Sequence, residues 1–152
     1  GFLIGPFFHD SISTLEVGSQ RLMVYMPEVH PLANRAVAEL GELAGENFIF
    51  GKLSHWRPFR ELVERECMDC GFVPRVVHEP FNSDGIFGLV SAGLGITIYP
   101  ERESRINPRG VVMKPLRGVF NRVQILAAWK KDNPSDSLAD FLDVVRQRIA
   151  VT

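Results

Sequence analysis

Short apolar runs alternate with helical patterns along the whole chain. The runs are rich in β-branched and aromatic residues and are bounded by Gly, Pro or polar residues, which is typical of buried strands. The candidate strands are Phe2–Ile4, Leu22–Met26, Phe48–Phe50, Arg75–His78, Ile96–Tyr99, Val111–Leu116 and Val123–Trp129. Strands that alternate with helices predict an α/β fold with a mostly parallel sheet.

Two segments have apolar residues at clear helical spacing. In residues 57–70 one helical face carries Phe59, Leu62, Val63 and Cys67. Gly71 follows as the stop signal. From Leu138 to Ile149 the same spacing follows Pro134-Ser135, a helix-start signal. Both segments are expected to be amphipathic helices.

Two further helices are expected. Residues 83–92 are largely apolar, with Asn82 as a plausible N-cap and Gly93 as the terminator. A short helix is expected around Val37, Leu40 and Leu43. Loops are expected over residues 5–18, 101–110 and 133–134, where Gly, Pro and polar residues interrupt the periodicity.

Composition narrows the class of protein. The 152 residues suffice for one ordinary domain or two small lobes, and no apolar run reaches the roughly 20 residues that span a bilayer. The formal charge of -1 argues against nucleic acid as a partner of this segment, because DNA-binding domains carry a basic excess. The chain starts without Met or a secretory signal, so we expect a piece of a longer or trimmed protein.

The sequence gives little indication of a metal, redox or catalytic site. Cys67 and Cys70 match a redox or zinc spacing, but they end a helix, where the dipole disfavours the thiolate, and no second ligand pair accompanies them. The histidines lie on different elements, which favours structural roles. No catalytic or phosphate-binding motif is found, so no enzyme activity, metal or cofactor is expected. Two cysteines at this spacing also indicate a reducing, cytoplasmic compartment.

Three ordered stretches carry a family resemblance. They are Leu22-Met23-Val24-Tyr25-Met26-Pro27 running into His30-Pro31-Leu32, then Gly71-Phe72-Val73-Pro74, then Leu89 to Ile96 ending at Tyr99-Pro100. In this order they resemble the effector-binding domains of LysR-type transcriptional regulators. The segments 111–116, 124–131 and 137–149 look like the closing strands and helix of that family.

The resemblance implies a bilobed α/β fold similar to type II periplasmic binding proteins. Residues 1–26 then form the late part of the first lobe and a crossing strand, 27–111 the second lobe, and 112–152 the return to the first lobe with the C-terminal helix. The first lobe is incomplete, and the helix-turn-helix is missing. The implied function is to sense a small molecule between the lobes, with DNA reached only through the missing N-terminal domain and with self-association as a dimer.

Candidate ligand contacts follow from the strand ends. Open α/β sheets bind ligands beyond the carboxyl ends of their strands, where helix N-termini attract anions. After Phe48–Phe50 the sequence offers Ser54, Trp56, Arg57 and Phe59. Arg57 could pair with a carboxylate and Trp56 could stack on an aromatic ring. The alternatives are that Arg57 is solvated and that Phe59 belongs to the core.

A second strand end and a first-lobe turn complete the candidate site. Asn82 and Ser83 start a helix and could donate to a ligand, although an N-cap explains Asn82 equally well. Gly5 and Pro6 follow the first strand and could contact the ligand from the other lobe, or form an ordinary turn.

Rival functions remain open at this stage. A solute-binding protein of the same bilobed class would serve a transporter, and an enzyme would need an acid and a base that converge on one pocket. The sequence does not identify the effector, for which an aromatic or other small carboxylate is compatible with Arg57 and Trp56.

Overall fold

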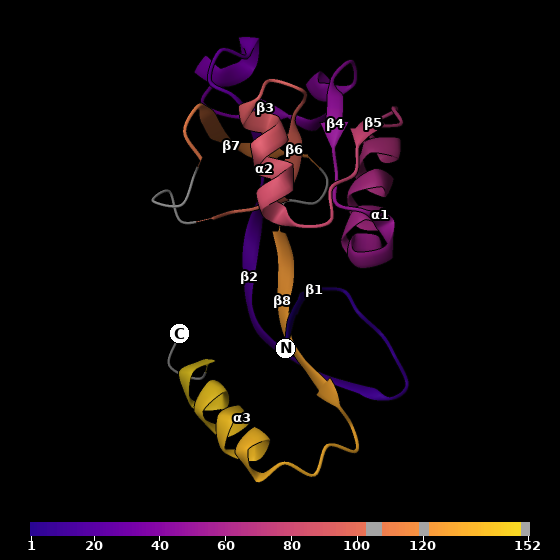
Figure 1. Cartoon of the computed structure of the whole chain (residues 1–152), viewed down its shortest axis with the longest axis vertical. Coiled ribbons are helices and arrows are strands. Elements are labelled where there is room, and N and C mark those ends of the chain that lie inside the picture. The colour runs from indigo at the N-terminus through magenta and orange to yellow at the C-terminus, as the bar shows by residue number, and fades with distance from the viewer. Residues whose placement is uncertain (103–107, 119–121, 150–152) are drawn as a thin grey trace. The chain divides into compact units, whose positions relative to one another are not determined.

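The computed structural model describes residues 1–102, 108–118 and 122–149. It divides into two compact units. Unit 1 comprises Gly1–Gln20 with Val123–Thr152, and unit 2 comprises Arg21–Arg122. The chain passes between the units inside two strands, β2 (Ile12–Pro27) and β8 (Arg122–Lys130), which are labelled in Figure 1. Residues 27–111, the predicted second lobe, lie within unit 2; the lobe boundaries themselves stay a prediction.

Unit 2 is built on a mixed sheet in the order β5-β4-β6-β2-β7-β3. Its other strands are β3 (Ala38–Glu39), β4 (Asn47–Ile49), β5 (Arg75–His78), β6 (Thr97–Pro100) and β7 (Val111–Arg117). β4 pairs with β5 in parallel, and a parallel bridge between Phe48 and Ile96 joins β4 to the start of β6. β2 is antiparallel to both β6 and β7, and β3 is parallel to β7.

These pairings give five strands of unit 2 one direction and β2 the opposite one. The predicted, mostly parallel sheet is therefore confirmed for unit 2. β2 is the exception because it enters unit 2 from unit 1, whereas the other strands are connected within unit 2.

Two helices cover the sheet of unit 2. α1 (Leu53–Asp69) connects β4 to β5, and α2 (Ser83–Ser91) connects β5 to β6. The two connections step across the sheet in opposite directions, and right-handed crossovers therefore place the helices on opposite faces. The side chains of β4 agree, since Phe48 stacks on Phe72 just beyond α1, whereas Ile49 packs in a cluster with α2.

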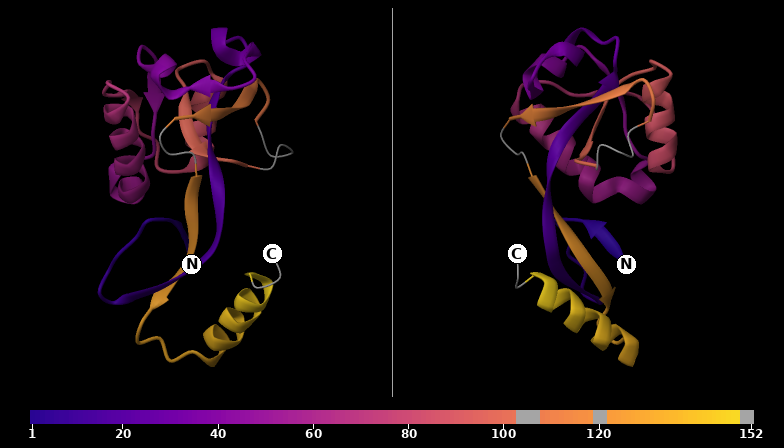
Figure 2. Two further views of the ribbon diagram at one scale, coloured as in Figure 1. Left: turned by 180° about the vertical axis from the view of Figure 1, so that it is seen from behind. Right: turned by 90° about the vertical axis from the view of Figure 1, so that its left-hand side faces the viewer.

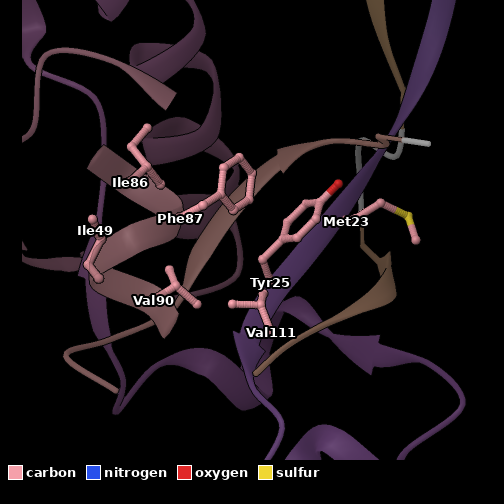
Figure 3. Packing of buried hydrophobic residues seen from close by; sticks show 7 residues of the cluster. All are labelled: Met23, Tyr25, Ile49, Ile86, Phe87, Val90 and Val111. Atoms are coloured by element: carbon pink, nitrogen blue, oxygen red, sulfur yellow. The ribbon is translucent and has the colours of Figure 1, made fainter. Parts of the chain in front are cut away.

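The buried cluster beneath α2 joins residues that are far apart in the sequence. It contains Met23, Tyr25, Ile49, Ile86, Phe87, Val90 and Val111. Figure 3 shows the Tyr25 and Phe87 rings facing each other, with an edge-to-face contact at a centroid distance of 5.0 Å. The Tyr25 hydroxyl is satisfied on both sides, because it donates to the Pro100 carbonyl and accepts from the Arg102 amide, each at 3.0 Å.

Unit 1 contains β1 (Phe2–Ile4), the first half of β2, most of β8 and α3 (Asp136–Ile149). β1 is antiparallel to β8, and β8 runs beside β2, as both views of Figure 2 show. α3 buries Leu142 and brings Phe141 to an edge-to-face contact with Phe2, at a centroid distance of 6.3 Å. The predicted C-terminal helix is confirmed.

One predicted loop is wrong in its second half. Residues 12–18 belong to the long strand β2. Their half-buried side chains, Leu15 and Val17, alternate with the exposed Glu16 and Gly18, and such alternation is the pattern of a strand with one wet face. The predicted loop 101–110 lies partly outside the described residues.

The start of α1 also differs from the prediction. The helix begins at Leu53 and not at residue 57, so Ser54 and Trp56 lie in its first turns. Pro58 lies inside the helix and lacks the N–H that would bond to the Ser54 carbonyl, yet the first turn is closed by the amides of His55 and Trp56, which donate to the Lys52 carbonyl at 2.9 and 3.0 Å.

The predicted short helix around residues 37–43 is replaced by smaller pieces. Two 3-10 turns, η1 (Pro31–Asn34) and η2 (Leu40–Leu43), flank β3. A capping box between Glu39 and Glu42 holds the start of η2. Val37 precedes β3, which pairs with β7, so this residue cannot join a helix. None of the described helices is long and apolar enough to cross a membrane.

Candidate functional site

The candidate site lies at one edge of the unit 2 sheet. Because β4, β5 and β6 are parallel, their carboxyl ends share this edge. α1 starts there after β4, and α2 starts there after β5. Two backbone hydrogen bonds tie the strand-end loops together: Phe50 N–H to the His78 carbonyl at 3.2 Å, and Lys52 N–H to the Pro80 carbonyl at 2.9 Å.

The first turn of α1 exposes unpaired helix donors. Lys52 occupies the N-cap position without a side-chain cap, and its carbonyl accepts from residues 55 and 56. The amides of Leu53 and Ser54 therefore have no acceptor within the helix, as expected for a helix start. The Ser54 hydroxyl lies 2.8 Å from Nδ1 of His55, and both side chains are exposed.

The start of α2 is capped by Asn82. Its side-chain oxygen accepts from the Gly85 amide at 2.8 Å, which confirms the N-cap interpretation of this residue. The side-chain NH2 group is not needed for that cap. Ser83 is half-buried, and its hydroxyl is a hydrogen-bond partner of Tyr99 at the end of β6. Asp84 in the first turn adds a negative charge to this end.

Trp56 covers the end of β4. Its indole packs on Gly51 so closely that a Cβ atom at Gly51 would lie 2.3 Å from indole carbons. The indole Nε1 donates to the Phe81 carbonyl at 3.2 Å, and the ring centroid lies 5.7 Å from that of Tyr99. Trp56 therefore links the strand ends of β4 and β6 to the loop before α2.

Lys52 and His55 both contact the exposed ring of Phe81, whose carbonyl is hydrogen-bonded to Trp56. The Lys52 ammonium lies 4.4 Å from the centroid of the Phe81 ring, a cation–π contact, and His55 meets the same ring edge-to-face at 5.8 Å. Phe81 is 62% exposed. Lys52 and Phe81 were not among the ligand contacts predicted from the sequence; their positions within two residues of the two helix starts are the signal that could have found them.

Two of the three arginines of α1, Arg57 and Arg60, differ in their burial and their partners. Arg57 is exposed and lies 3.3 Å from Glu61, one turn further along α1. Arg60 is the buried one: its side chain is 10% exposed and pairs with Glu64 at 2.7 Å and with Glu79. Phe59 lies in the core, as its alternative interpretation held. A role for Arg57 in ligand binding stays a prediction.

Burial governs the ionisation of the tyrosines near the site. It raises the pKa of Tyr25 to about 12, against the opposing effect of the Arg102 amide. It also raises the pKa of Tyr99, against the effects of Arg102 and Ser83. Both phenols are therefore neutral hydrogen-bonding groups at physiological pH.

Gly5 and Pro6 lie in unit 1, at the end of β1. Gly5 is buried, and its amide donates to the Gln124 carbonyl at 2.8 Å; Pro6 is exposed. The contact of these residues with a ligand stays a prediction.

Metal and thiol chemistry can be assessed over the described part of the chain. In residues 1–102, 108–118 and 122–149 no three His, Cys, Asp or Glu side chains gather as a metal site would require. Cys67 is fully buried, and burial raises the pKa of its thiol to about 12, so its thiolate is scarce at neutral pH.

Comparison with known proteins agrees with this geometry. The model of the family described as "LysR substrate binding domain" matches residues 1–150. The chain belongs to this family. The resemblance seen in the sequence is thereby confirmed.

Among curated proteins, the Hca operon transcriptional activator HcaR of Escherichia coli (strain K12) is 29% identical over 150 residues. The match covers 99% of this chain and 51% of HcaR. The chain spans about half the length of the curated relatives that it matches. These relatives carry the names of transcriptional regulators, and none is named as a transport protein or an enzyme.

Solved structures share the fold of the chain. Full-length CbnR bound to its target DNA has a TM-score of 0.84 and 18% identity, with 98% of this chain and 52% of CbnR covered. The effector binding domain of BenM with its effector benzoate has a TM-score of 0.75 and 23% identity, with 99% and 69% covered. The predicted α/β class, of the type II periplasmic-binding-protein kind, is confirmed, and the chain covers only part of that domain.

Proposed function

We propose that the chain is the effector-sensing part of a LysR-type transcriptional regulator, and that it binds a small carboxylate at the strand-end edge of unit 2 without turning it over. The observation that carries the proposal is the meeting of two helix starts at this edge. Leu53 and Ser54 at α1, and Ser83 and Asp84 at α2, have amides that lack an acceptor within their helices. Such amides, aligned with the positive ends of the helix dipoles, favour an anion.

The charges around the edge indicate where the carboxylate of the ligand would bind. Lys52 supplies a positive charge beside α1, whereas Asp84 supplies a negative one at α2. We therefore assign the carboxylate to the α1 start, near Lys52 and Ser54. The NH2 group of Asn82 and the hydroxyl of Ser83 then face the rest of the ligand as neutral groups.

Support for a small organic ligand comes from solved relatives. The BenM domain, which shares this fold, is described with its effector benzoate. A ligand that binds two conformations with different affinity shifts their populations, and this is how binding at one site could alter an attached DNA-binding domain. Self-association and a cytoplasmic location belong to the same proposal, as does DNA contact through a domain outside this chain.

The test is a thermal-shift screen of the purified chain against small carboxylates, headed by benzoate, with Asn82→Asp and Asn82→Ala as paired variants. Asp caps a helix as well as Asn does, so Asn82→Asp keeps the fold of α2 while it replaces the NH2 group that would face the ligand by a negatively charged oxygen. A saturable rise in Tm that weakens in Asn82→Asp supports the site.

Arg57→Gln tests whether Arg57 contacts the ligand in addition to the residues at the start of α1. If the ligand-induced rise in Tm is lost in this variant, Arg57 contacts the ligand. If the rise is unchanged, Arg57 makes only its surface pair with Glu61. If no carboxylate raises the Tm of the parent chain, the proposed function of this segment is wrong.

A further inference from the structure

We infer that Trp56 is a gate that occupies an aromatic subsite of the proposed effector site, and that a flat aromatic ring of the effector takes the place of its indole. The inference rests on the proposed function and deepens it, because it restricts the ligand to a flat aromatic carboxylate.

The first observation is the fit of the indole on bare backbone. Gly51 has no side chain, and a Cβ atom there would come within 2.3 Å of Cγ and Cδ1 of Trp56 and 2.5 Å of Nε1. The Tyr99 ring also contacts the indole, with its centroid 5.7 Å away and its plane tilted by 57°. The indole therefore occupies a slot whose walls include the Gly51 backbone and the Tyr99 ring.

The second observation is that little space remains behind the indole. A cavity of about 10 Å³ lies between Trp56 and the core side chains Phe59, Val63, Ile86 and Ile98. This volume holds no more than about one water molecule. A ligand ring can enter the slot only if the indole leaves it, so occupation by Trp56 and occupation by ligand exclude each other.

The third observation concerns how the indole is held. Trp56 is only half-buried, and its indole is held by the hydrogen bond from Nε1 to the carbonyl of Phe81, which is itself an exposed residue. Water can replace that partner on both atoms when the indole swings outward. Opening then costs mainly the ring contacts, and a ligand ring restores those contacts.

The position of the slot fits an aromatic acid. Gly51 is followed directly by Lys52 and by the free amides of Leu53 and Ser54. A ring in the place of the indole would carry its carboxylate toward these donors. A saturated ring of the same size is thicker and would not lie against the Gly51 backbone as closely as the flat indole does.

Fluorescence can follow the gate directly. The chain has two tryptophans, Trp56 and Trp129, so a Trp129→Phe background leaves Trp56 as the sole reporter. In this background we would measure acrylamide quenching of Trp56 and thermal shift, with benzoate and with cyclohexanecarboxylate, which has the same charge but no flat ring. Benzoate should raise the Tm and at least double the quenching constant; cyclohexanecarboxylate should change neither.

Gly51→Ala tests the same idea without ligand. Its methyl group should push the indole out and raise the quenching constant, and it should prevent benzoate from stabilising the chain, because it occupies the place that the ligand ring would take. Gly88→Ala is the matched control, since a methyl group there meets nothing within 4 Å. Trp56→Ala, which leaves the place of the indole empty, should tighten benzoate binding by about threefold or more, because a larger fraction of the chain is open before binding.

The outcomes separate the two proposals. If a carboxylate raises the Tm but leaves the quenching of Trp56 unchanged, the gate is overturned and the effector site stands. If Gly51→Ala leaves the indole shielded or still binds benzoate, or if Trp56→Ala binds benzoate no better than the parent, the gate is overturned as well. If no carboxylate binds the parent or Trp56→Ala, both the site and the gate fail.

Discussion

Gly95→Ala should destabilise the chain through a clash between two main-chain segments. Gly95 precedes β6 and lies against the start of β4, where the Ile96 amide donates to the Asn47 carbonyl at 2.9 Å. A methyl group on Gly95 would lie 2.6 Å from that carbonyl oxygen and 3.2 Å from its carbon. Backbone cannot rotate aside as a side chain can, so β4 and β6 must separate.

The size of the effect follows from the overlap. The methyl–oxygen distance is about 0.8 Å shorter than the 3.4 Å at which ordinary contact begins. Relief by a backbone shift costs about 2 kcal/mol. For a chain of this length that loss lowers Tm by roughly 4–8 °C.

Gly88→Ala should change the free energy of unfolding in the opposite direction. Gly88 is exposed in the middle of α2, and a methyl group there meets nothing within 4 Å. Alanine restricts the unfolded chain and favours helix, so stability should rise by about 0.5–1 kcal/mol. Urea unfolding of the parent and both variants, followed by circular dichroism, gives the midpoints. Equal midpoints for Gly95→Ala and the parent would refute the close approach of β4 and β6.

Three further predictions concern buried polar groups, a cap and a thiol. Tyr25→Phe should cost about 1–3 kcal/mol in urea unfolding, because the Pro100 carbonyl and the Arg102 amide lose their shared partner. Burial raises the pKa of Tyr25 to about 12 from about 10 in the unfolded chain, so this contribution is complete below about pH 10 and is lost as the pH rises toward 12; the unfolding midpoint of the parent should fall more than that of Tyr25→Phe over this range. Asn82→Ala should lower the free energy of unfolding by about 1 kcal/mol and Asn82→Ser by much less, and equal losses would argue against the cap. A thiol reagent such as Ellman's should label Cys70 but not Cys67 in the native chain and both cysteines in urea; fast labelling of both in native buffer would contradict the burial of Cys67.

Much of the fold was predictable because the signals are local. The strands at residues 2–4 and 75–78 and the helix starting at Ser83 appear in the structure within a residue of the prediction. The Gly residues that end the helices do so for the expected reason: Gly71 and Gly93 have φ of 91° and 77°, a conformation that costs other residues energy. The long β2 was missed because its first half is polar on one face.

The candidate site was predictable only in outline. That ligand groups should gather after Phe48–Phe50 and before Ser83 follows from the general rule for open sheets. Which of two arginines three residues apart is buried could not be read from the sequence, because Arg60 is held by Glu79 from another segment. The pairing of Trp56 with Gly51 likewise joins residues whose contact depends on where α1 starts.

The sequence by itself determined the family, most of the strands and helices in their order, and the glycines that follow α1 and α2, because these depend on residue order, spacing and local backbone preference. Only the tertiary structure decided that β2 runs against its neighbours, that Arg60 rather than Arg57 is buried, and that Trp56 fills the slot between Gly51 and Tyr99. The physical reason is that burial and close contact between segments far apart in the chain are properties of the packed molecule, and local patterns do not encode which partners meet.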